Sequence, residues 1–158
     1  MLPYLLIAVV VFGLDQWSKF EVVRHLTDGP IRVDAYLNLA LVYNRGAAFG
    51  FLSNQSGWQN VFFVVVAVLI VVGIVWFLVR APREDRLMVV ALMLVLGGAL
   101  GNLVDRLRLG RVVDFIDFHI GAWHWYTFNL ADSAITVGAL LLALDALRSR
   151  GTMLSQKK

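Results

Sequence analysis

The sequence has 158 residues, of which 59% are hydrophobic and 16% are charged, with a formal net charge of +3. Soluble domains are about 45–50% apolar and about 25% charged, so this composition disfavours a soluble enzyme. No basic stripe with interleaved aromatic residues accompanies the positive charge, so we expect no nucleic-acid partner. The absence of cysteine excludes disulfides, thiolate metal ligands and a cysteine nucleophile. The length suits a single domain over residues 1–158.

Four apolar segments, taken in chain order, predict four transmembrane helices. They are Leu2–Leu14, Val61–Val79, Leu87–Val104 and Phe128–Leu147. At about 1.5 Å per residue, the two middle segments nearly span a hydrocarbon core of about 30 Å. The first segment is shorter and spans only if its helix continues to about Val23. A signal peptide is the alternative for residues 1–14, but no basic segment precedes it and no cleavage site follows it.

The connection between the first and second predicted helices and the connection between the third and fourth both contain strand-like segments. Residues Tyr36–Tyr43 are apolar with aromatic and β-branched members, and a turn-prone Asn-Arg-Gly follows them. Val112–His119 and Trp123–Phe128 flank Ile-Gly-Ala and can pair as a hairpin. The fold class predicted is therefore an all-α membrane protein with four transmembrane helices and a small β-rich cap on the outer face.

Basic residues indicate the orientation of the chain. Residues 80–86 hold three arginines, and residues 148–158 hold four basic residues in a short stretch. The two longer connections are more dilute, although the raw counts are equal at seven when Lys19 is assigned to their side. Density near the helix ends predicts that both termini are cytoplasmic and that the long connections face outward.

Asp15 lies well inside the first predicted helix, with Lys19 four residues later on the same face. An ionisable residue in a membrane costs roughly 2.5–3.5 kcal/mol on insertion scales, so it is a candidate functional residue by default. The pair predicts an internal ion pair or an interhelical hydrogen bond. The alternative is a catalytic or proton-relay acid.

The third predicted helix ends in a polar group. Gly97 and Gly101 have the spacing that lets helix backbones approach closely. Asn102, Asp105 and Arg106 follow at the outer end of the same helix. We interpret Asp105 and Arg106 as packing residues with an interfacial ion pair.

Asp114 and Asp132 form the candidate catalytic pair. Asp114 lies in the apolar segment Val-Val-Asp-Phe-Ile, and Asp132 lies near the outer start of the fourth helix. The connection between them is long enough to bring both carboxylates to one depth. Two carboxylates in a poorly hydrated site share one proton, which suits hydrolysis by an aspartic mechanism. Each has a structural alternative, as an interfacial anchor or as the cap of the fourth helix.

Two other chemistries are disfavoured. Asp117, His119 and His124 combine residue types that bind metals, but the histidines lack the helical HExxH spacing and a tight turn separates them. We therefore expect no metal and no cofactor. Ser133 lacks a nucleophile-elbow pattern, so a serine hydrolase is also disfavoured.

Five motifs in this order resemble the bacterial lipoprotein signal peptidase (type II signal peptidase) family over nearly the whole chain. They are Asp15-Gln-Trp-Ser-Lys19, Tyr43-Asn-Arg-Gly-Ala-Ala-Phe-Gly50, Gly101-Asn-Leu-Val-Asp-Arg106, Val112-Val-Asp-Phe115 and Phe128-Asn-Leu-Ala-Asp-Ser133. The family's catalytic aspartates fall on Asp114 and Asp132. The resemblance implies an aspartic endopeptidase of the bacterial inner membrane that cuts prolipoproteins just before a diacylglyceryl-modified lipobox cysteine.

The resemblance also implies the surroundings of the dyad and its ligands. The expected substrate-binding or site-supporting residues are Asp15, Asn44, Gly46, Phe49, Asn102, Asp105, Arg106, Asn129 and Ala131. The loop of Gly46 and Phe49 is expected to close over the peptide. Expected partners are lipid-modified prolipoproteins, membrane lipid and globomycin-type cyclic peptide inhibitors, and the protein is expected to be a monomer. The alternative function is a small proton-relay or transporter-type membrane protein that uses its intramembrane aspartates.

Overall fold

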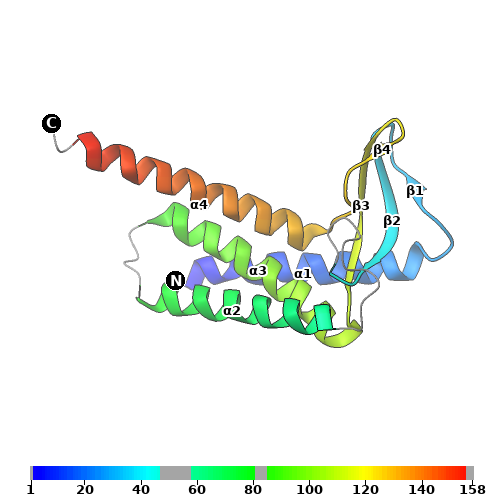
Figure 1. Cartoon of the computed structure of the whole chain (residues 1–158), viewed down its shortest axis with the longest axis horizontal. Helices are drawn as coiled ribbons and strands as arrows, with labels where there is room; N and C mark the ends of the chain where they lie inside the picture. Colours follow the sequence, from blue (N-terminus) through cyan, green and yellow to red (C-terminus); the bar gives the residue numbers. More distant parts are fainter. Residues whose placement is uncertain (1, 47–57, 81–84, 156–158) are drawn as a thin grey trace.

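The computed structural model describes residues 2–46, 58–80 and 85–155, with side chains described up to residue 148. Within these ranges the four helices run roughly lengthwise together, and the strands stand at one end of the bundle (Figure 1). The helices are α1 (Leu2–His25), α2 (Trp58–Arg80), α3 (Arg86–Leu109) and α4 (Leu130–Ser155). The start of α1 and the end of α4 lie at the end opposite the strands (Figure 1).

The central helix is α3, which packs against the three others and is the most buried of them. Its first turn is capped by Asp85, whose side chain accepts a hydrogen bond from the backbone N–H of Met88 at 3.1 Å. Gly110 ends it with φ 67°, a left-handed conformation that glycine adopts without steric cost. The sequence therefore fixes both ends of the helix that carries Asn102 and Asp105.

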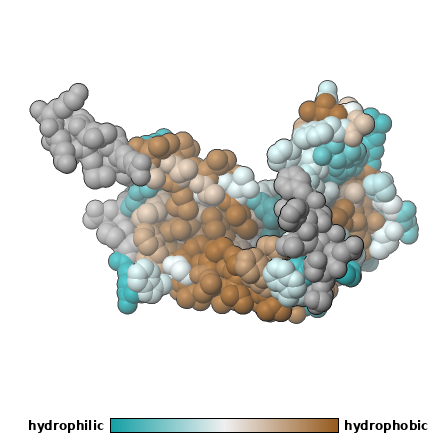
Figure 2. Space-filling model, viewed as in Figure 1, coloured by the Kyte–Doolittle hydropathy of each residue, from teal (hydrophilic) through white to brown (hydrophobic). Residues whose placement is uncertain are grey.

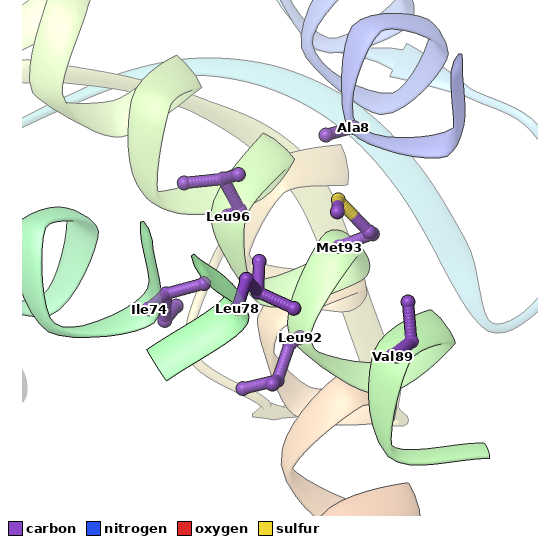
Figure 3. Close-up of a cluster of buried hydrophobic side chains, with 7 residues drawn as sticks. All are labelled: Ala8, Ile74, Leu78, Val89, Leu92, Met93 and Leu96. Carbon is purple, nitrogen blue, oxygen red and sulfur yellow. The ribbon is translucent and has the colours of Figure 1, made fainter. Parts of the chain in front are cut away.

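One of two apolar clusters lies toward the end of the bundle remote from the strands, and the other packs the end of α1 against β3. The buried side chains of the first cluster come from α1, α2 and α3 (Figure 3) and are Ala8, Ile74, Leu78, Val89, Leu92, Met93 and Leu96. The outer faces of the helices remain apolar as well (Figure 2), with Leu69 and Val79 of α2 exposed by 65% and 78%. Such a surface needs an apolar solvent, which the interior of a membrane supplies.

Among the described residues, three helices are long and apolar enough to cross a membrane, namely α2, α3 and residues 130–148 of α4. The prediction of four spans is therefore confirmed only for these three. Helix α1 has a comparable length, but its second half carries polar residues that lower its apolar content, among them Asp15, Gln16 and Lys19. Those polar residues face the interior of the bundle, as described below.

The predicted β-rich cap is present as a four-stranded antiparallel sheet in the order β1-β2-β3-β4. The strands are β1 (Ile31–Arg32), β2 (Leu37–Asn44), β3 (Val112–Ile120) and β4 (Trp123–His124). The two long strands match the predicted segments closely. The short strand β1 was not predicted, and β4 is shorter than Trp123–Phe128, because after His124 only an isolated bridge joins Phe128 to Ile116.

Strand β2 contains a bulge. Leu39 pairs with Ile116 and Val42 pairs with Asp114, so β2 has one more residue than β3 over this interval. Because side chains alternate along β3, Asp114 shares one face with Ile116 and Phe118, whereas Asp117 lies on the other face. The sheet thus has two chemically different faces.

Candidate active site

Asp114 and Asp132 lie near each other where the sheet joins the helix bundle. Asp114 comes from β3 and is fully buried, with an exposed fraction of 0%. The side-chain amide of Asn44 donates to its Oδ2 at 2.9 Å, and the side-chain amide of Asn129 donates to its Oδ1 at 2.7 Å. Both donors lie on segments that border β3, so the fold holds this carboxylate from two sides.

Asp132 lies in the first turn of α4. The side-chain amide of Asn102 donates to its Oδ1 at 2.8 Å, and the backbone N–H of Asn129 donates to its Oδ2 at 3.3 Å. In return, the backbone N–H of Asp132 donates to Oδ1 of Asn129 at 2.8 Å. This reciprocal pair is a capping box in which Asn129 is the N-cap, so Asp132 supports the cap from the third helical position.

Asn129 connects the two carboxylates directly. Its side-chain nitrogen donates to Asp114, while its backbone nitrogen donates to Asp132. The same side-chain nitrogen also approaches Oδ1 of Asn102 at 3.2 Å, and Asn129 itself is fully buried. One cap residue therefore sets the position of both acids relative to the start of α4.

The environment of Asp114 favours its protonated form. Burial, together with the negative charge of Asp132, outweighs the hydrogen bonds from Asn44 and Asn129 and raises the pKa of Asp114 to about 6. Two neighbouring acids, one protonated and one ionised, supply the acid and the base that hydrolysis of a peptide needs. The arrangement can therefore hold one proton at about pH 6 and below, well above the usual range of an aspartate.

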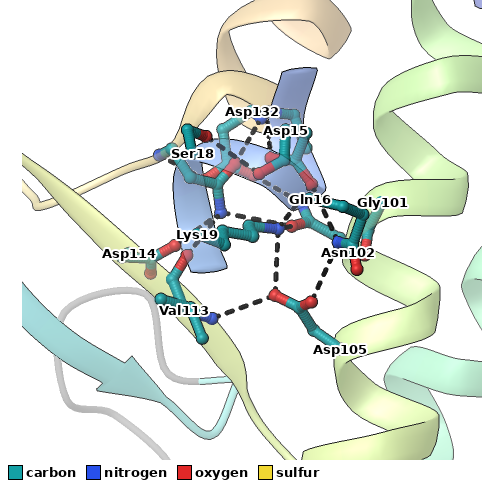
Figure 4. A network of polar contacts seen from close by, with 12 residues as sticks. Asp15, Gln16, Ser18, Lys19, Gly101, Asn102, Asp105, Val113, Asp114 and Asp132 are labelled. Carbon is teal, nitrogen blue, oxygen red and sulfur yellow. Dashed lines mark hydrogen bonds and ion pairs between the residues drawn. The ribbon is translucent and has the colours of Figure 1, made fainter. Parts of the chain in front are cut away.

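A buried ion-pair network adjoins the dyad between α1 and α3 (Figure 4). Nζ of Lys19 lies 2.8 Å from Oδ2 of Asp15 and 2.9 Å from Oδ2 of Asp105. Lys19 also donates to Oδ1 of Asn102 at 2.9 Å, and Asn102 in turn donates to Asp132. Lys19 is only 3% exposed, so these three acceptors offset the free-energy cost of burying its positive charge.

The predicted ion pair and interhelical hydrogen bond of Asp15 are both present. Besides Lys19, Asp15 accepts a hydrogen bond at Oδ1 from the backbone N–H of Ala131 at 2.9 Å. The contacts of Asp105 differ from the interfacial ion pair predicted for it. Asp105 is buried, pairs with Lys19 and accepts a hydrogen bond from the backbone N–H of Val113. Its position in the sequence gave no indication that its partner lay on another helix.

The described contacts of Arg106 are also different from an interfacial ion pair. Nη1 of Arg106 donates to the carbonyl oxygen of Asn102 at 3.4 Å, and its guanidinium lies 5.1 Å from the ring centre of Phe63. Its positive charge attracts Asp132 and Asp114 electrostatically. Arg106 thus contributes charge to the dyad from the end of α3.

Close helix contacts place these side chains. A Cβ on Gly101 would lie 2.3 Å from Oδ2 of Asp15, and a Cβ on Gly98 would lie 2.5 Å from the carbonyl oxygen of Ala131. Gly97 approaches the backbone of Ala8 in the same way, at 2.7 Å. The small residues of α3 therefore let α1 and α4 come close enough for Asp15 to reach α4.

The first connection also reaches the site. Gly46 has φ 105°, and its backbone N–H donates to Oδ1 of Asn44 at 2.8 Å, which orients the amide that holds Asp114. A Cβ at Gly46 would collide with the ring of Phe63 as well. Phe49, the other predicted residue of this loop, lies outside the described residues.

Two contributors were not predicted. The hydroxyl of Tyr126 accepts a short hydrogen bond from Asn44, and burial next to Asp114 and Asp132 raises the pKa of Tyr126 to about 12. Gln16 donates to Asp15, to Asp105 and to the carbonyl oxygen of Gly101. Gln16 lies in the motif Asp15-Gln-Trp-Ser-Lys19, which is a usable signal, whereas nothing in the sequence distinguishes Tyr126 from its aromatic neighbours.

The fold and the site together define a helical membrane protein with two neighbouring carboxylates, of which Asp114 is buried and Asp132 is half-buried. A sequence model described as signal peptidase (SPase) II matches residues 7–148. The chain is 51% identical over 147 residues to the lipoprotein signal peptidase of Burkholderia cenocepacia (strain HI2424), which covers 92% of this chain and 88% of that protein.

A second relative, the lipoprotein signal peptidase of Burkholderia vietnamiensis (strain G4 / LMG 22486), is 49% identical over 95% of this chain and 91% of its own. A solved structure described as a bacterial membrane enzyme superimposes with a TM-score of 0.86 at 34% identity, over 96% of this chain and 92% of that one. The chain therefore belongs to the signal peptidase II family of membrane proteases. The resemblance inferred from the five motifs is confirmed.

Proposed function

We propose that the protein is an aspartic endopeptidase that removes the signal peptide from diacylglyceryl-modified prolipoproteins, cutting just before the lipobox cysteine. The observation that carries this proposal is the pair of carboxylates, Asp114 and Asp132, held by one shared residue, Asn129. The names of the relatives, lipoprotein signal peptidases, support the substrate class.

The reaction follows from the proton that the two acids share. The ionised carboxylate takes a proton from a water molecule, whose oxygen attacks the carbonyl carbon of the scissile peptide bond. The protonated carboxyl donates its proton to the carbonyl oxygen, which gives a gem-diol. Collapse of the gem-diol breaks the C–N bond and passes a proton to the leaving nitrogen. This step needs neither a metal nor a cofactor.

Residues around the dyad are proposed to bind or support the substrate. Arg106 and the amides of Asn44 and Asn102 are donors for a peptide backbone or for the developing oxyanion. Gly46 and Phe49 belong to the loop proposed to close over the peptide, and the chemistry fits globomycin-type cyclic peptides as inhibitors. A monomer is sufficient, because Asp114 and Asp132 come from one chain.

An apolar groove on the cap supports a lipid-anchored substrate. The groove has a volume of about 490 Å³ and is lined by Leu37, Ile116, Phe118, Trp123, Trp125 and Phe128. Ile116 and Phe118 share the face of β3 that carries Asp114, so the groove lies on the same side of the sheet as this carboxylate. Apolar residues next to the scissile bond can be buried there.

We also propose that α1 is a fourth membrane span and that both termini are cytoplasmic. The 24 residues of α1 reach about 36 Å at about 1.5 Å per residue, and its mid-helix polar residues Gln16 and Asp15 contact α3 and α4 rather than lipid. Arg80 and Arg86 lie at the end opposite the sheet, which supports an outward-facing dyad in a bacterial inner membrane.

Turnover of a diacylglyceryl-modified lipobox peptide by the purified protein tests the proposal. Asp114→Asn and Asp132→Asn are each expected to lower turnover by at least about 10²-fold, within the range of lost acid–base catalysis. Asp117→Asn is the matched control, because Asp117 lies on the same strand but the opposite face. More than about a hundredth of wild-type turnover in either dyad variant would refute the aspartic mechanism. No turnover by wild-type protein would favour the proton-relay alternative.

A further inference from the structure

We propose that Asp117, His119 and His124 form a binding site for a divalent transition metal ion of the zinc type. One ligand atom from each residue can be chosen so that all three lie within 4.8 Å of one another. The site lies on the face of the cap opposite Asp114. It is therefore separate from the dyad.

The strand geometry brings the three side chains together. His119 of β3 and His124 of β4 are directly paired residues, and their rings lie 5.0 Å apart at an interplanar angle of 16°. Asp117 precedes His119 by two residues, so it projects from the same face of β3. Gly121 turns the chain between the histidines with φ 61°. The tight turn that disfavoured a metal in the sequence is thus what places the two histidines side by side.

The spacing of one pair of ligand atoms, on His124 and Asp117, is close to that of ligands on a tetrahedral ion. Nδ1 of His124 lies 2.8 Å from Oδ1 and 3.0 Å from Oδ2 of Asp117. Two ligands on a zinc ion with bonds of about 2.0–2.1 Å are about 3.3 Å apart. A metal ion would therefore take the place of the bridging proton once these atoms have moved slightly apart. The hydrogen-bonded pair is the proton-bound form of the same arrangement.

A neighbouring amide orients the carboxylate. Asn38, paired with Asp117 across β2 and β3, donates from Nδ2 to Oδ2 of Asp117 at 3.1 Å and lies 3.4 Å from Nδ1 of His119. Ligating carboxylates in metal sites are held by such outer hydrogen bonds.

Burial and ligand type define the class of ion. Asp117 and His119 are buried, whereas the side chain of His124 is 52% exposed, which gives an ion access from solvent. Two imidazoles and one carboxylate favour Zn²⁺, Cu²⁺ or Ni²⁺ over Mg²⁺ and Ca²⁺, which prefer oxygen ligands. Three protein ligands leave a fourth position for water. The ion would link β3 to β4 and stabilise the cap.

Zn²⁺ titration of the detergent-solubilised full chain, purified without a polyhistidine tag, tests the site. The chain has three histidines, and the third, His25, pairs with Glu21 on α1, so His25→Ala is the matched control. Calorimetry is expected to show one equivalent of Zn²⁺ bound and a higher Tm when it is bound. His119→Ala and His124→Ala are each expected to weaken binding at least about tenfold, the loss expected for a disrupted metal site, and His25→Ala is expected to leave it unchanged.

A second measurement keeps the test valid if the alanine variants fail to fold the cap. Co²⁺ added to the wild-type protein is expected to give the visible absorption of a tetrahedral site with nitrogen and oxygen ligands, which the isosteric Asp117→Asn weakens. The proposal is overturned if wild-type protein binds no Zn²⁺ and gives no such Co²⁺ spectrum. It is equally overturned if a folded His119→Ala/His124→Ala double variant binds Zn²⁺ as tightly as wild type.

Discussion

The backbone N–H of Ala131 donates a hydrogen bond to Oδ1 of Asp15 at 2.9 Å. This contact joins the middle of α1 to the first turn of α4, across 116 residues of sequence. Both residues are fully buried, at 0% exposure. The carboxylate of Asp15 therefore helps to fix the turn that carries Asp132.

A substitution series at Asp15 tests this structural role. Asp15→Asn can keep the bond from Ala131 but turns an amide group toward Lys19, so its Tm is expected to be moderately lowered. Asp15→Leu leaves the N–H of Ala131 unsatisfied, at a cost of about 1–3 kcal/mol, and its Tm is expected to be lower still. The exposed Asp28→Asn serves as the control. Total inactivation of both Asp15 variants at an unchanged Tm would instead place Asp15 in the catalytic apparatus.

The pKa of Asp114 predicts a pH dependence of stability. The folded value is about 6 and the ordinary value is 3.8, so between these pH values the folded protein binds more protons than the unfolded chain. The stabilising contribution of Asp114 is therefore complete below about pH 3.8 and is lost as the pH rises to about 6. Asp114→Asn does not titrate. The fall in Tm from pH 4 to pH 7 is expected to be smaller in this variant, and an equal fall in both proteins would contradict the raised pKa.

A glycine pair tests the close packing of α3. Gly101→Ala places a methyl group 2.3 Å from Asp15, and the overpacking is expected to cost about 1–3 kcal/mol and to lower turnover. Gly73→Ala in α2 meets nothing within 4 Å, so it is expected to be neutral or to stabilise by up to about 1 kcal/mol. Thermal unfolding of both variants measures the difference. Equal Tm values would show that α1 can move away from α3 without loss.

Metal removal separates the dyad from the proposed metal site. EDTA is expected to leave peptide turnover unchanged, because the proposed hydrolysis uses only the two carboxyl groups. His119→Ala and His124→Ala are expected to keep substantial activity for the same reason. Activity that disappears with EDTA and returns with added zinc would show that the reaction depends on a metal.

Cysteine labelling tests the orientation, because the chain has no native cysteine. Thr27→Cys and Ala122→Cys introduce thiols at exposed positions at the sheet end of the molecule. A membrane-impermeant thiol reagent is expected to label both in intact spheroplasts, and to label Ser155→Cys only after permeabilisation. The reverse pattern would place the dyad on the cytoplasmic side.

The sequence predicts the periodic parts of the fold well. The apolar run Val61–Val79 lies within α2 (Trp58–Arg80), and the strand-like residues 112–119 lie within β3. These segments are predictable because their surroundings, either lipid or the membrane interface, determine their composition. Strand β1 has two residues and depends on its pairing with Leu39 and Asn38, which no local pattern reveals.

The candidate site shows the same division. The relation between Asp15 and Lys19 was predictable because both lie on one helix four residues apart. The second partner of Lys19, Asp105, lies on α3, and contacts between elements depend on packing that a single sequence does not display. Tyr126 was missed for the same reason, since its hydroxyl approaches Asn44 only after the strands have paired.

The bulge in β2 determines which residues of this strand face the side of Asp114. If β2 kept all its residues but paired regularly from Leu39 and Ile116 onward, Tyr43 instead of Asn44 would face the side of Asp114. Removing one residue between Leu39 and Val42 would instead remove the bulge and leave Val42 opposite Asp114 and Asn44 opposite Val112, so the amide of Asn44 would still face the carboxylate that it holds. Natural variation in the length of this stretch should therefore include loss of this single residue, whereas loss of a second residue would exchange the two faces of the strand.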